Sequence, residues 1–96
     1  MPEQNINVKI DDAALKGVYS NMMMVSHTRE EFILDFLNIY PAQKQGVVVS
    51  RVITSPEHLK RLVAALTENM QKYENQFGKI EETSPVDSKE IGFRTQ

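Results

Sequence analysis

The 96-residue chain contains no cysteine, and it has few glycines, prolines and aromatic residues. The absence of cysteine excludes disulfides, thiolate nucleophiles, cysteine-ligated zinc and iron–sulfur clusters. The glycines are too far apart in the sequence for a phosphate-binding loop. No stretch approaches the roughly 18 uncharged apolar residues of a membrane helix, and the N-terminus lacks the basic and apolar segments of a secretory signal. We therefore expect a cytoplasmic protein without membrane contact.

Neither sign of charge dominates, because 11 Lys and Arg residues stand against 13 Asp and Glu residues for a formal net charge of −2. This balance disfavours a general polyanion binder. The length fits one small domain with a thin core, which association with another copy would supplement. We expect a single α+β domain over residues 1–80, followed by a flexible polar tail over residues 81–96 that lacks hydrophobic periodicity.

Four segments have the pattern of β-strands. Residues 5–11 alternate apolar and polar side chains, whereas residues 18–27, 32–40 and 47–54 are apolar at positions of both parities. Short polar turns separate these segments, which predicts a four-stranded antiparallel meander. Both faces of the central strands are then apolar.

Centring each turn predicts how the strands pair. For the last two strands the paired residue numbers sum to 86, which places Asp35 opposite Arg51. We interpret these two residues as a structural ion pair that fixes the register, with a functional site as the alternative interpretation. For the preceding two strands the predicted sum is near 58. The further predicted pairs are Ile33 with Ile53, Leu37 with Val49, Val25 with Ile33, and Met24 with Leu34.

One long helix follows the strands. Ser55 is its predicted N-cap, Pro56 fits its first position, and Gly78 ends it. Apolar residues recur at spacings of three or four along one stripe, which comprises Leu59, Leu62, Val63, Leu66, Met70, Tyr73 and Phe77. A helix with one stripe packs on one face of the sheet, so the second apolar face needs another cover.

Either the chain ends or a second chain must cover the remaining face. The tail is too polar and the first strand too short, so we expect a homo-oligomer, most simply a two-fold dimer. The candidate surface for a second copy or another partner consists of Tyr19, Met23, Val25, Ile33, Leu37 and Val49. Because methionine side chains repack readily, the Met22–Met24 run would also suit an apolar polypeptide.

Four blocks of the sequence resemble a family of small prokaryotic proteins catalogued only as a domain of unknown function. The blocks are G-V-Y-S-N-M-M-M-V-S-H, E-E-F-I-L-D-F, V-V-V-S-R-V-I-T-S-P-E-H-L-K-R-L and A-L-T-E-N-M-Q-K-Y-E-N-Q-F-G-K-I. The resemblance implies no activity, cofactor or site residue for this chain. The predicted order of four strands and a long helix is also similar to the core of the export chaperone SecB, in architecture alone.

No sequence motif indicates catalysis, and G-x-S-x-G is absent. A metal site would need His27 and His58 to converge with nearby carboxylates, and local structural roles explain both histidines better. We expect no enzymatic activity, no cofactor and no metal. The predicted function is a non-catalytic, homo-oligomeric assembly module, and its sharper form binds hydrophobic or unfolded polypeptide in a SecB-like manner.

The alternative function is that of a nucleic-acid-binding accessory protein. Lys60, Arg61 and Lys72 of the predicted helix would supply the basic surface. Glutamates interleave with these residues and cancel most of their field, so we regard the helix surface as solvated.

Overall fold

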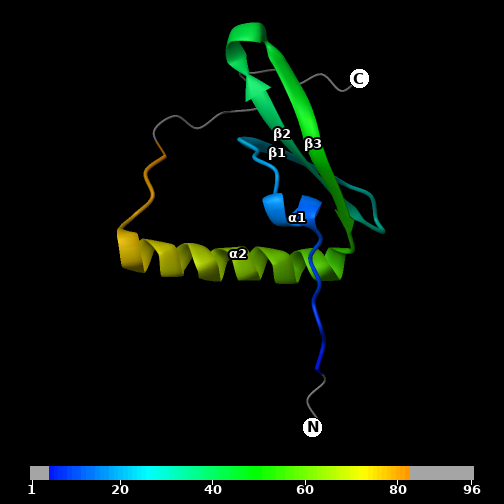
Figure 1. Cartoon of the computed structure of the whole chain (residues 1–96), viewed down its shortest axis with the longest axis vertical. Coiled ribbons are helices and arrows are strands. Elements are labelled where there is room, and N and C mark those ends of the chain that lie inside the picture. The colour runs from blue at the N-terminus through cyan, green and yellow to red at the C-terminus, as the bar shows by residue number, and fades with distance from the viewer. Residues whose placement is uncertain (1–4, 83–96) are drawn as a thin grey trace. The chain divides into compact units, whose positions relative to one another are not determined.

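The computed structural model describes residues 5–82 and has an α+β fold with an antiparallel sheet and a C-terminal helix. Its elements in chain order are α1 (Asp12–Lys16), β1 (Met22–His27), β2 (Phe32–Tyr40), the 3-10 turn η1 (Pro41–Gln43), β3 (Gln45–Thr54) and α2 (Pro56–Phe77). The central strand of the sheet is β2, and Figure 1 shows β2 and β3 as one long hairpin closed at η1.

The described residues divide into two units, one ending at Leu59 and one beginning at Lys60. The first unit holds the sheet and the second holds most of α2, and each is described by itself. The expected single domain over residues 1–80 stays a prediction. Of the expected tail, residues 83–96 lie outside the described residues.

The sheet formed by residues 5–82 has three strands, so the predicted four-stranded meander is wrong by one strand. Residues 5–11 form neither helix nor strand. Their apolar side chains, Ile6, Val8 and Ile10, are exposed. Period-two alternation favours a strand only where a neighbouring strand supplies hydrogen bonds, and residues 5–11 pair with none of the described strands.

A short helix replaces the loop expected after this segment. Asp11 caps α1, because its side-chain Oδ1 accepts a hydrogen bond from the Ala14 N–H at 2.7 Å. The helix ends at Gly17, whose φ of 72° favours glycine.

Pairing between β2 and β3 follows the predicted sum of 86 over the first half of β2. Asp35 pairs with Arg51, and Ile33 pairs with Ile53. A β-bulge then shifts the register after Phe36, so Leu37 pairs with Val48 and the predicted partner Val49 is wrong. Val49 is the extra residue on β3.

Gly46 makes room for the most buried apolar side chain of the sheet. A Cβ atom at Gly46 would lie 3.3 Å from Leu37 Cδ1. Leu37 is 3% exposed and Leu34 is 5% exposed, and these two leucines are the buried hydrophobic residues of the described chain. The core is therefore thin, as expected for this length.

The numbers of the residues that pair between β1 and β2 sum to 59, so the predicted sum of 58 is wrong by one. Val25 pairs with Leu34 rather than Ile33, and Met24 pairs with Asp35 rather than Leu34. The turn over 28–31 is centred between Arg29 and Glu30, which corresponds to a sum of 59, and within it Thr28 N–H donates to the Glu31 carbonyl oxygen at 2.9 Å. The shift moves every β1 side chain to the opposite face of the sheet from the predicted one.

The strand predicted over residues 18–27 begins only at Met22, and before it Asn21 binds β2 through both its backbone and its side chain. Asn21 N–H donates to the Leu37 carbonyl oxygen at 3.2 Å. Ile39 N–H donates to Asn21 Oδ1 at 2.9 Å, and Asn21 Nδ2 donates to the Ile39 carbonyl oxygen at 3.2 Å. Asn38 Nδ2 donates to the Tyr19 carbonyl oxygen at 2.9 Å. The side-chain amides of Asn21 and Asn38 thus hold residues 19–21, which precede β1, against the end of β2.

Replacing Asn21 with alanine should measurably destabilise the sheet. Asn21→Ala removes both hydrogen bonds to Ile39, and we expect the free energy of unfolding to fall by about 1–2 kcal/mol. Chemical denaturation followed by circular dichroism measures this change. Asn5→Ala is the control, since Asn5 is exposed outside the sheet. Equal effects of the two substitutions would contradict a structural role for the Asn21 amide.

The second unit consists mainly of α2. The helix α2 itself begins at Pro56, within the first unit. Ser55 is its N-cap, because Ser55 Oγ accepts a hydrogen bond from the His58 N–H at 3.1 Å. Gly78 follows its last residue with a φ of 98°, and Gly78 N–H donates to the Glu74 carbonyl oxygen at 2.9 Å. Among residues 5–82, no helix is both long and apolar enough to cross a membrane.

Candidate functional site

Asp35 and Arg51 form a bidentate ion pair across β2 and β3. Arg51 Nε donates to Asp35 Oδ1 at 2.7 Å, and Arg51 Nη2 donates to Asp35 Oδ2 at 2.9 Å. Asp35 is 8% exposed, whereas most of the Arg51 side chain remains accessible. The central strand therefore holds a nearly buried carboxylate whose two oxygens face one guanidinium.

The ion pair keeps Asp35 ionised. The hydrogen bonds from Arg51 lower the pKa of Asp35 below its ordinary value of 3.8, although desolvation acts in the opposite direction. The same hydrogen bonds raise the pKa of Arg51. A carboxylate held in this way is a poor proton carrier at neutral pH, so the geometry favours a structural interpretation.

Strand pairing divides the side chains of the sheet between two faces, because directly paired residues share a face and neighbours along a strand alternate. We name the first the ion-pair face. It contains Met22, Met24 and Ser26 of β1, Ile33, Asp35, Leu37 and Ile39 of β2, and Gly46, Val48, Arg51 and Ile53 of β3.

We name the second the Val25 face. It contains Met23, Val25 and His27 of β1, Phe32, Leu34, Phe36, Asn38 and Tyr40 of β2, and Gln45, Val47, Ser50, Val52 and Thr54 of β3. No Asp, Glu, Lys or Arg is among these residues. The Val25 face is thus apolar along its centre and free of Asp, Glu, Lys and Arg, with the imidazole of His27 at its end.

The predicted partner surface is divided by this arrangement. Met23 and Val25 lie on the Val25 face, whereas Ile33 and Leu37 lie on the ion-pair face. The remaining two residues lie outside the regular pairing, because Tyr19 precedes β1 and Val49 is the bulge residue. The six residues therefore do not form one continuous surface.

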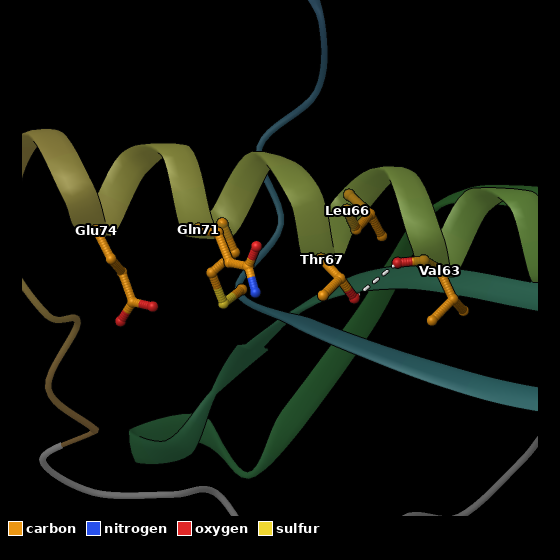
Figure 2. Close-up of a pocket in the computed structure, with 6 residues that line it drawn as sticks. Val63, Leu66, Thr67, Gln71 and Glu74 are labelled. Atoms are coloured by element: carbon orange, nitrogen blue, oxygen red, sulfur yellow. Dashed lines mark hydrogen bonds between the residues drawn. The ribbon is translucent and has the colours of Figure 1, made fainter.

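A shallow groove runs along one side of α2. It is lined by Val63, Leu66, Thr67, Met70, Gln71 and Glu74, and Figure 2 shows its labelled residues following one another along the helix. The Thr67 hydroxyl donates to the Val63 carbonyl oxygen at 2.9 Å, so it is already engaged within the helix. The groove therefore offers mainly apolar contact, with the Glu74 carboxylate at one end.

The two histidines have local contacts. The His27 ring lies against the Phe32 ring with centroids 5.3 Å apart, and the His58 backbone takes part in the α2 cap. Within residues 5–82, no three His, Asp or Glu side chains are grouped so that they could hold a metal ion.

Sequence reasoning missed the two asparagines that bind across the end of β2. Asn21 and Asn38 are polar residues inside strongly apolar runs, and that interruption was the available signal. Their amides are occupied by backbone groups, which gives them a structural part in the sheet.

Comparison with known proteins gives a family and no further relative. No curated protein matches the chain, and no solved structure matches it. One family model matches residues 1–82, and this range contains every helix and strand described above. The chain therefore belongs to the family described as "Protein of unknown function (DUF3467)".

Proposed function

We propose that the chain is a non-catalytic module of the cytoplasm that assembles with further copies of itself through its sheet. The observation that carries this proposal is the apolar character of both sheet faces. Val25 on one face and Ile53 on the other are each 54% exposed, although both are large aliphatic residues. Exposed apolar surface of this extent on a small chain favours a partner.

The helices between residues 5 and 82 supply too little cover for two faces. The longer helix, α2, has one apolar stripe, and we propose that this stripe covers one face at most. The shorter helix, α1, has five residues and buries none of them. We propose that a second chain covers the remaining apolar face.

The free energy available from such a cover is substantial. Removal of about 400 Å² of apolar surface per copy from water contributes about 10 kcal/mol before the cost of association. Self-association supplies this cover without a further component, because a closed two-fold contact uses the same patch on both copies.

The solution mass tests the proposal. We expect multi-angle light scattering of the purified full chain to give at least twice its 11.0 kDa mass, with dissociation on dilution. A mass of 11.0 kDa at every concentration at which the chain stays folded would refute self-assembly.

A second candidate function is the binding of apolar or unfolded polypeptide. The groove of α2 favours it, because Val63, Leu66 and Met70 line an open apolar surface. Binding of a fluorescent apolar peptide to the full chain tests this function. Nucleic-acid binding has less support, since Lys72 Nζ lies 3.4 Å from Glu68 Oε1 and its charge is largely compensated.

A further inference from the structure

We infer that the second copy packs on the Val25 face, so that the two sheets stack face to face. This inference rests on the proposed self-assembly and adds which of the two sheet faces mediates it. The argument depends on the charges of the two faces and on the side chains that each leaves accessible.

Charge distinguishes the two faces. In a two-fold contact, each patch meets the same patch of the partner, so a charged group near the axis meets a like charge. The Val25 face has no Asp, Glu, Lys or Arg, and two copies of it approach without such repulsion. On the ion-pair face, two Arg51–Asp35 pairs would meet, and the accessible part of each Arg51 guanidinium would have to be desolvated.

The accessible side chains of the Val25 face suit a dry contact between sheets. Exposed large apolar residues are present on all three strands, namely Met23, Val25, Tyr40, Val47 and Val52. Between them lie the half-buried rings of Phe32 and Phe36. Side chains of two such faces interdigitate when sheets stack about 10 Å apart.

The absence of cysteine allows a direct test with single thiols. Val25→Cys reports on the Val25 face and Ile53→Cys on the ion-pair face, and the two native residues are equally exposed at 54%. We expect alkylation of Val25→Cys to slow about tenfold as the protein concentration rises through the association range. Alkylation of Ile53→Cys should not depend on concentration.

A charge placed on each face provides the second measurement. Val25→Asp should weaken self-association by at least about 100-fold, because burial of an unpaired carboxylate is costly. Ile53→Asp should leave the association constant within about threefold of the unmodified chain. Circular dichroism of both variants identifies loss of folding, and the thiol measurement decides the case if Val25→Asp fails to fold.

The possible results separate the inference from the proposal beneath it. A chain that is monomeric at all concentrations overturns both. An oligomer in which Ile53→Cys, or neither thiol, becomes protected overturns the choice of face and leaves self-assembly standing. Protection of Val25→Cys that is independent of concentration, or that requires added unfolded polypeptide, also overturns the inference, because the cover is then another segment or another partner.

Discussion

Leu37→Ala is expected to lower the free energy of unfolding by about 2–5 kcal/mol, the range measured for removing a buried leucine side chain. Leu37 is 3% exposed and lies against Gly46, where a Cβ atom would already approach to 3.3 Å. The backbone around Gly46 is held by strand pairing, so the cavity left by the substitution cannot collapse fully. Small domains have stabilities of about 5–15 kcal/mol, and this loss is a large part of that.

Denaturant titration of purified Leu37→Ala measures the loss, and Leu15→Ala is its matched control. Leu15 is an exposed leucine of α1, so its truncation should change the free energy of unfolding by less than about 0.5 kcal/mol. Lys72→Ala should likewise leave the free energy of unfolding almost unchanged, because the ion pair between Lys72 and Glu68 is solvent-exposed. If Leu37→Ala proved as stable as Leu15→Ala, Leu37 would not belong to the core.

Arg51→Met is expected to reverse the pH dependence that Asp35 contributes to stability. In the unmodified chain the pKa of Asp35 is lowered on folding. Its contribution is therefore present above the unfolded pKa near 3.8 and is lost as the pH falls through the lower folded value. In Arg51→Met the guanidinium is gone and desolvation remains, so the folded pKa should rise above the unfolded one. Stability should then increase as the pH falls.

Thermal unfolding measured as a function of pH shows whether stability falls or rises as the pH is lowered. At neutral pH we expect Arg51→Met to be less stable than Asp35→Asn, because Arg51→Met leaves an ionised, nearly buried carboxylate without its partner. Asp35→Asn is the control, since it removes the titration and keeps a side-chain oxygen that accepts from Arg51. An Arg51→Met profile that parallels the unmodified chain between pH 3 and 6, roughly one Asp titration range, would show that Asp35 is not desolvated.

The sequence predicted the elements better than the pairing between them. Residues 32–40 and 47–54 are so rich in apolar and β-branched side chains that their strands could be located directly, and opposite charges at Asp35 and Arg51 fixed one register. The bulge could not be predicted, because nothing distinguishes Val49 from its valine neighbours. The loop over 28–31 has the length expected from the predicted strands, but its centre corresponds to a sum of 59, and the predicted sum of 58 misses it by one.

This single-residue difference also explains why the predicted partner surface is divided. That both sides of the strands are apolar can be recognised without knowing the strand register. Deciding which residues share a face requires the register, and every β1 side chain lies on the other face when the β1–β2 sum is 59 instead of 58. The missing strand has another cause. Residues 5–11 have the right alternation, but a strand exists only with a partner.

The bulge at Val49 interrupts an otherwise regular edge strand. β3 lies at the border of the sheet, is rich in valine and contains no proline, which are the properties of segments that polymerise into amyloid. An extra residue twists such a strand and breaks the straight row of donors and acceptors that an incoming strand would extend. We expect deletion of Val49 to straighten that row and to make β3 more prone to pair with a strand of another chain.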